Sequence, residues 1–315
     1  MELDPSFEDV LAAAERIRGS VHRTPVLSSS AIDGLAGASL VFKCENLQKV
    51  GAFKARGATN AVLALDDEAA ARGVATHSSG NHAAALALAA RTRGIAAHIV
   101  MPRTAPPVKR AAVEGYGARI TTCEPTLEAR EAALAGVVAA TGATFVHPYD
   151  DPLVIAGQGT AVLELLTDVP ELEAVMGPVG GGGLMSGTAI AVAGSRPEVA
   201  VWGAEPAAAD DAYRSLRDGR RHPPLAPRSI ADGLLTALSD RTFRILSGGL
   251  EGILTVSEDG IVRAMRLLWE RMKLVVEPSG AVPLAAVLEH RERFAGRRIG
   301  LMISGGNADL DRLPW

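Results

Sequence analysis

The stretch AVMGPVGGGGLMSGTAIAV, residues 174–192, decides the fold class of this chain. It begins as an apolar run typical of a buried strand and ends as a helical run, and a strand that passes directly into a helix is the repeating unit of an α/β fold. The glycines between them, Gly180, Gly181, Gly182 and Gly183, let backbone N–H groups converge on an anion at the positive end of the helix. We therefore predict that this turn holds a phosphate. The alternative is a tight turn without a ligand.

Strand–helix units also flank this stretch on both sides. Before it, short β-branched runs alternate with alanine-rich helical runs, and after it the alternation continues. The expected strands are 74–77, 96–100, 119–122, 143–146, 199–204 and 299–303, and the expected helices are 82–91, 107–116, 127–140 and 260–272. The pattern predicts an α/β protein of two domains, each an open, mostly parallel sheet flanked by helices.

The composition is that of a globular protein. The chain has 315 residues, enough for two domains, and 48% hydrophobic against 22% charged residues exclude disorder. With 32 basic and 36 acidic residues the net charge is −4, so neither nucleic acid nor an acidic membrane is expected as a partner. The N-terminus lacks a signal-peptide pattern, and the two cysteines are too few for a disulfide framework. These features predict a cytoplasmic protein.

Only five of the 32 basic residues are lysines, so a lysine in this chain is a candidate for a role that arginine cannot perform. Lys54 lies in the stretch VGAFKARG (50–57), beside Phe53 and among small residues that offer little polar surface to a charged amine. Desolvation lowers the pKa of a lysine, and an unprotonated amine is the group that forms a Schiff base. Lys54 is therefore a candidate nucleophile. The alternative is an ordinary surface lysine at the start of a helix.

Three further motifs follow expected strands, at the sheet edges where α/β proteins bind ligands. The stretch THSSGNH (76–82) is dense in short hydrogen-bonding side chains, and ISGGN (303–307) brings a hydroxyl to the end of the last strand. Glu205, the carbonyl of Ala209 and Asp211 could bind a hard cation, although acidic residues before a helix are usually first-turn charges. No G-x-S-x-G motif occurs, which excludes the nucleophile elbow of α/β-hydrolases.

Taken in order, these motifs resemble the fold-type II pyridoxal-phosphate enzymes and, within them, the serine/threonine dehydratase and serine racemase group. The resemblance covers nearly the whole chain and is carried by KCENLQ (43–48), GAFKARGA (51–58), SSGNHA (78–83), GQGT (157–160), GGGG (180–183), AEP (204–206) and SGGN (304–307). It implies the tryptophan synthase beta-like architecture, with the cofactor in the cleft between two domains. Residues 1–63 and 152–315 would form a large cofactor-binding domain and residues 64–151 a small substrate-binding domain.

The resemblance also implies roles for individual residues toward pyridoxal 5'-phosphate. Lys54 would carry the aldimine, Phe53 would pack against the cofactor ring, and Asn81 would bind its 3-hydroxyl. The glycine run 180–183 would hold the phosphate, and Ser304 would meet the pyridine nitrogen. Because a neutral serine cannot keep that nitrogen protonated, rapid elimination of a β-hydroxyl group is favoured over a long-lived carbanion.

Substrate and metal contacts follow from the same resemblance. Ser79 would be a second catalytic residue, since the equivalent serine of the racemases faces the lysine across the substrate Cα. The candidates for binding the substrate carboxylate are Ser78, Asn81 and Arg130. The set of Glu205, Ala209 and Asp211 matches the divalent-cation site of one branch of the group, which implies Mg²⁺ or Ca²⁺. A homodimer is usual for the family.

The function predicted from the sequence is dehydration of a β-hydroxy amino acid to a 2-oxo acid and ammonia. L-Threonine, L-serine and 3-hydroxy relatives such as 3-hydroxyaspartate are the candidate substrates. An amino-acid racemase on the same scaffold is the nearest alternative. A non-catalytic protein that binds a phosphate-containing ligand is a further alternative, and a visible absorbance band from a lysine imine would exclude it.

Overall fold

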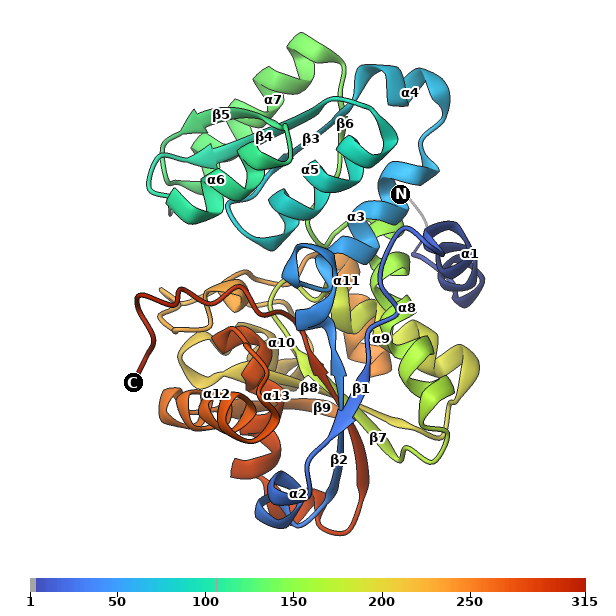
Figure 1. Cartoon of the computed structure of the whole chain (residues 1–315), viewed down its shortest axis with the longest axis vertical. Helices are drawn as coiled ribbons and strands as arrows, with labels where there is room; N and C mark the ends of the chain where they lie inside the picture. The colour runs from blue at the N-terminus through green and yellow to red at the C-terminus, as the bar shows by residue number, and fades with distance from the viewer. Residues whose placement is uncertain (1–3, 106) are drawn as a thin grey trace.

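Six strands form the larger sheet, in the order β1-β2-β10-β7-β8-β9 (Figure 1). Only β1 runs antiparallel to its neighbour in this sheet, and the other adjacent pairs are parallel. The strands are β1 (Val26–Ser28), β2 (Ser39–Cys44), β7 (Ala174–Pro178), β8 (Ala200–Pro206), β9 (Gly252–Val256) and β10 (Arg298–Ile303). The computed structural model describes residues 4–105 and 107–315.

Helices cover both faces of the larger sheet and form a separate apolar core on each. One face carries α1 (Phe7–Ile17), α8 (Pro152–Asp168), α9 (Gly183–Ser195) and α11 (Asp240–Gly249); the other carries α2 (Ser30–Ala36), α12 (Glu258–Met272) and α13 (Pro278–Glu289). Because both faces are buried, β7 and β10 are almost continuously apolar instead of alternating with polar residues.

The smaller sheet forms the second domain, at the top of Figure 1. Its order is β5-β4-β3-β6, and all its neighbours are parallel. The strands are β3 (Val74–His77), β4 (Ala97–Pro102), β5 (Arg119–Cys123) and β6 (Thr144–Phe145). Its helices are α4 (Asp67–Arg72), α5 (Asn81–Arg93), α6 (Pro107–Gly115) and α7 (Leu127–Thr141), and α3 (Lys54–Ala64) packs between α8 of the larger domain and α5. Apolar residues of α3, α5 and α6 form one core, and those of α7 form another.

The predicted α/β architecture with two parallel-sheet domains is confirmed. Every strand expected from the sequence is present, and β3 has the expected bounds. Helix α8 was not expected, and its glycines explain why: a Cβ at Gly157 would lie 2.6 Å from Gly57 Cα, and one at Gly159 would lie 2.7 Å from the Gly187 carbonyl oxygen. These glycines weaken helix propensity but allow α8 to pack closely against α3 and α9.

The stretch 174–195 divides into β7, the glycine turn and α9. In the part of the chain that the structure describes, every helix is too short or too polar to span a bilayer.

Candidate active site

The carboxyl ends of three neighbouring parallel strands lie at the edge of the larger sheet that is nearest to the smaller domain (Figure 1). Strand β10 leads into Ser304, β7 leads into the glycine run 180–183, and β8 leads into the turn at 207–210. Since parallel strands end at the same edge, segments far apart in the sequence become neighbours there. This edge is where open α/β sheets bind their ligands.

The loop that precedes α3 docks against the segment after β10. The Phe53 N–H donates to the carbonyl oxygen of Ser304 at 3.0 Å, and the Gly306 N–H donates to the carbonyl oxygen of Gly51 at 2.9 Å. Gly51 has a φ of 69°, in the left-handed region that favours glycine. These contacts bring Lys54, directly after Phe53, into the same site as Ser304.

Lys54 is the first residue of α3, and its amine is held by a backbone group instead of a carboxylate. The Nζ atom donates to the carbonyl oxygen of Pro148 at 2.6 Å and lies 5.1 Å from the centroid of the Phe53 ring. Burial lowers the pKa of Lys54 from 10.5 to about 8. The amine therefore loses its proton more readily than that of an ordinary lysine, as a nucleophile or base requires.

A buried ion-pair cluster holds the first turn of α3, and the sequence analysis assigned it no role. Arg56 is fully buried and donates to Glu45 at 2.7 and 2.8 Å and to Glu164 at 2.8 Å. Lys43, also buried, donates to Glu164 at 2.6 Å. The signal in the sequence is the charged pair Lys43 and Glu45 at the end of the apolar run of β2. Because loss of one partner would leave an uncompensated buried charge, this cluster holds the backbone that carries Lys54.

The glycine run forms the N-terminal end of α9. Gly182 is its N-cap, with a φ of 88°, and has no side chain that could accept hydrogen bonds from the first turn. Within the described residues, the backbone N–H groups of Gly180, Gly181 and Gly182 donate no hydrogen bond. Unpaired N–H groups at the positive end of a helix are the donor set that a phosphate needs. The residues present therefore fit the phosphate group of the expected cofactor.

Tyr149 lies against the glycine run, a contact that the sequence analysis missed. A Cβ at Gly181 would overlap the Tyr149 ring. That ring packs edge-on against His147, with 4.6 Å between the ring centroids. The same turn contributes the Pro148 carbonyl that accepts from Lys54. One short segment between the domains thus supports both the amine and the anion cradle.

The turn between β3 and α5 contains Ser78 and the half-buried Ser79. The Ser78 hydroxyl accepts from a backbone N–H within the turn at 3.3 Å. Arg130, near the start of α7, acts on the same end of β3: burial is the main cause of the lowered pKa of His77, the charge of Glu131 opposes it, and the charge of Arg130 adds to it. The Arg130 Nε atom is buried and has no hydrogen-bond partner among the described residues. A guanidinium donor without a protein partner is of the chemical type that binds a carboxylate.

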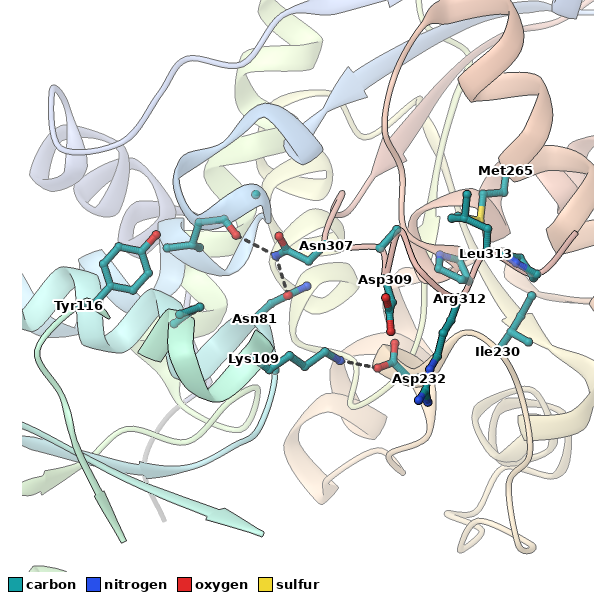
Figure 2. A pocket seen from close by; sticks show the side chains of 18 residues that line it. Asn81, Lys109, Tyr116, Ile230, Asp232, Met265, Asn307, Asp309, Arg312 and Leu313 are labelled. Carbon is teal, nitrogen blue, oxygen red and sulfur yellow. Dashed lines mark hydrogen bonds and ion pairs between the residues drawn. The ribbon is translucent and has the colours of Figure 1, made fainter. Parts of the chain in front are cut away.

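Asn81, the first residue of α5, connects the two domains. Its Nδ2 donates to both carboxylate oxygens of Glu277, at 3.0 and 3.3 Å, and its Oδ1 accepts from Asn307 Nδ2 at 2.9 Å. Glu277 was not among the predicted site residues. Asn81 and Asn307 line a cavity of about 680 Å³. Lys109 and Asp232 form an ion pair of 2.6 Å across the same cavity, from the smaller domain to the larger (Figure 2).

Glu205 and Asp211 bring two buried carboxylates together between β8 and α10 (Asp211–Asp218). Glu205 accepts two backbone N–H groups of α10, at 3.1 and 2.9 Å, whereas neither Asp211 oxygen has a hydrogen-bond partner in the described residues. Burial raises the pKa of Glu205 to about 9 and that of Asp211 to about 6. The described residues hold no group of three or more His, Cys, Asp or Glu suited to a metal. With the carbonyl of Ala209, the donor chemistry nevertheless fits a hard divalent cation.

Comparisons with known proteins identify the family. The family described as "Pyridoxal-phosphate dependent enzyme" matches residues 17–305. A beta-hydroxyaspartate dehydratase of Paracoccus denitrificans (strain Pd 1222) is 53% identical over 311 residues, which cover 99% of this chain and 99% of that protein. The crystal structure of serine racemase from Dictyostelium discoideum has a TM-score of 0.94 at 48% identity and covers 97% of this chain and 99% of its own. The structure of maize serine racemase has a TM-score of 0.96 at 45% identity and covers 98% of this chain and 95% of its own. Because the family matches most of the sequence and these relatives share its fold from end to end, this chain belongs to the fold-type II pyridoxal-phosphate dependent enzymes.

Proposed function

We propose that this enzyme is a pyridoxal-phosphate dependent dehydratase, an ammonia-lyase that converts a β-hydroxy amino acid to a 2-oxo acid and ammonia. The proposed substrates are L-threonine, L-serine and 3-hydroxy relatives such as 3-hydroxyaspartate. The observation that carries the proposal is Lys54, a desolvated amine held by the same turn that packs against an anion cradle. The 53% identity with a beta-hydroxyaspartate dehydratase favours dehydration as the main reaction.

Lys54 is proposed to provide both the covalent attachment and the base. When bound, pyridoxal phosphate supplies an aldehyde carbon that an amine can attack and a ring that withdraws electrons from the substrate. The Pro148 carbonyl orients Nζ of Lys54 at 2.6 Å. A pKa of about 8 leaves more of this amine unprotonated near neutral pH than an ordinary lysine would have. The same unprotonated amine would be the base that takes the proton from the substrate Cα.

The remaining cofactor contacts come from both domains. The glycine run 180–183 would bind the phosphate through backbone N–H groups, and the Phe53 ring would pack against the cofactor ring. Asn81 would donate to the 3-hydroxyl, and Ser304 would meet the pyridine nitrogen with a neutral hydroxyl. Since a neutral hydroxyl does not hold positive charge on that nitrogen, negative charge at Cα is dispersed less, which favours prompt loss of the β-hydroxyl group.

Substrate binding is proposed for the smaller domain. Ser78, Asn81 and Arg130 would bind the substrate carboxylate, with the Arg130 guanidinium as the charged partner. This assigns residues 64–151 to the substrate and residues 1–63 and 152–315 mainly to the cofactor. The chain is further proposed to act in the cytoplasm as a homodimer.

Amino-acid racemisation is the second candidate. The 48% identity with the serine racemase of Dictyostelium discoideum favours it, as does the placement of Ser79 in the turn after β3. The two reactions differ in what Ser79 must do. Elimination from an L-substrate needs a base on one face of Cα only, whereas racemisation needs a second proton donor on the opposite face.

Replacing Ser79 by alanine should therefore separate the two reactions. Racemisation should fall by at least about 10²-fold, because a positioned acid or base contributes that much or more, while elimination from the L-substrate persists. Elimination from a D-substrate should fall much further than elimination from the L-substrate. The measurement is chiral analysis of the recovered substrate together with oxo-acid release, for wild type and Ser79→Ala.

Ser78→Ala provides the contrast, since weaker carboxylate binding should reduce both reactions together. If the wild-type enzyme inverts L-serine faster than it releases pyruvate, the dehydratase proposal fails and the racemase takes its place.

We also propose that Glu205, Asp211 and the Ala209 carbonyl bind Mg²⁺ or Ca²⁺. Without a cation these carboxylates favour their protonated forms, because burial raises both pKa values. The folded chain then keeps protons that the unfolded chain loses above about pH 4. The stability from these groups is therefore fully present at low pH and is lost as the pH rises through about 6 and about 9.

Added Mg²⁺ or Ca²⁺ should raise the melting temperature, and the rise should be larger at pH 8 than at pH 5. A cation at ~100 times its dissociation constant contributes about 2.7 kcal/mol, which corresponds to roughly 4 °C for a chain of this size. Differential scanning calorimetry with chelator and with each cation measures this. Glu205→Gln should remove the response, whereas the matched control Asp210→Asn should keep it. Equal melting temperatures with chelator and cation at pH 8 would rule out the site.

A further inference from the structure

Glu277 is a buried carboxyl group at the centre of the contacts between the domains. It is the N-cap of α13, and its backbone N–H donates to the carbonyl oxygen of Gly305 at 3.1 Å. A Cβ at Gly305 would overlap the Glu277 carboxylate and would lie 3.3 Å from Asn81 Nδ2. Glu277 therefore lies between the Asn81 amide and the backbone at Gly305, which directly follows Ser304. Asn81 and Ser304 are the two side chains proposed to contact the cofactor ring.

The hydrogen bonds around Asn81 determine which way its amide points. Nδ2 faces the two oxygens of Glu277. Oδ1 faces the Nδ2 of Asn307 (Figure 2). If the amide were rotated by half a turn, its oxygen would face a carboxylate and its NH₂ would face another NH₂. Both contacts would then be repulsive, because an ionised carboxylate only accepts and an NH₂ group only donates. Only one orientation satisfies all three side chains.

We propose that Glu277 is a positioning residue for the cofactor: its carboxylate fixes the Asn81 amide so that the second N–H of Nδ2 is presented to the cofactor's ring hydroxyl oxygen. This inference rests on the proposed function, because it assumes that Asn81 contacts that oxygen. Nδ2 carries two hydrogens, so one can bind Glu277 while the other binds an oxygen of the ligand. A carboxylate makes the stronger charge-assisted bond and so controls the orientation more firmly than a neutral acceptor.

The protonation of Glu277 provides a signature of this role. Burial raises the pKa of Glu277 to about 7, and the negative charge of Asp232 adds to the rise. The positive charge of Lys109 and hydrogen bonds from Asn81 and the Asn307 backbone act in the opposite direction. Protonation would turn one acceptor oxygen into a donor and weaken the hold on Asn81. The spectrum of the bound cofactor should therefore change with pH near the pKa of Glu277.

The test uses the purified apoenzyme titrated with pyridoxal phosphate, with the visible absorbance of the bound cofactor as the readout. Glu277→Ala should weaken cofactor affinity roughly tenfold or more, the effect of losing a hydrogen bond to a charged group. Glu277→Gln keeps the size and one acceptor oxygen, so affinity should fall less, but the spectral transition near neutral pH should disappear. Asp232→Asn is the matched control: it removes a carboxylate from the cavity that Asn81 also lines, and this carboxylate binds Lys109 instead of Asn81.

Asp232→Asn should keep its affinity within about twofold, and its spectral transition should move to lower pH because a like charge has been removed. Wild-type affinity and an unchanged pH transition in Glu277→Gln would overturn the inference, whether or not Glu277→Ala folds. A wild-type protein that develops no visible absorbance with pyridoxal phosphate would instead overturn the proposed function. The two failures are therefore distinguishable in one set of titrations.

Discussion

Lys54→Ala should release no measurable oxo acid from any β-hydroxy amino acid, a loss of at least about 10³-fold, while its melting temperature stays near that of wild type. The substitution removes the group that attaches the cofactor and the base that takes the Cα proton, and such roles are not replaced by neighbours. The fold should survive because Lys54 makes a single hydrogen bond, to the Pro148 carbonyl, and no ion pair among the described residues. The measurement is oxo-acid release together with the visible spectrum after addition of pyridoxal phosphate.

Lys54→Arg tests whether the amine or merely a positive charge is required. Arginine keeps the charge but stays protonated in proteins, so it cannot attack an aldehyde carbon. This variant should also lose activity and the visible band. Lys49→Ala, in the same loop, is the matched control and should keep both. Substantial turnover by either Lys54 variant, in the absence of added amine, would remove the central claim.

Gly181→Val should lower cofactor affinity by about tenfold or more. A Cβ at this position would overlap the Tyr149 ring, so either the ring or the glycine turn must move. Movement of the turn misaligns the N–H groups that are proposed to bind the phosphate, and lost charge-assisted hydrogen bonds cost about 1.5–3 kcal/mol each. Turnover at saturating cofactor should persist, because Lys54 is unchanged. Equilibrium titration with pyridoxal phosphate measures the affinity.

Two controls separate crowding from a general effect of adding a side chain. Gly136→Val places the same side chain in open space on α7 and should leave cofactor affinity unchanged. Combining Gly181→Ala with Tyr149→Ala removes the opposing ring and should recover part of the affinity that Gly181→Ala alone loses. Unchanged affinity in Gly181→Val would mean that the glycines serve only the tight turn.

The sequence by itself determined the fold class and most of the strand–helix units. The apolar runs of β7 and β10 are patterns of consecutive residues, so they are visible without coordinates although the layers that bury them are distant in the chain. The same holds for the glycine run before α9, since a strand, a glycine turn and a helix are all local features. Lys54 could be singled out because small and aromatic neighbours already indicate desolvation.

Only the tertiary structure decided which distant groups share the site. Glu277 lies 196 positions from Asn81, and Glu164 lies 108 positions from Arg56, yet these side chains are in hydrogen-bond contact. Such pairs have no local pattern, because they arise from how the two sheets and their covering helices pack. The same packing gives Glu277 and Glu205 raised pKa values, since burial and the nearest charges set those values. Sequence spacing therefore indicated which residue types carry the chemistry. The three-dimensional packing decided which residues orient those side chains and shift their pKa values.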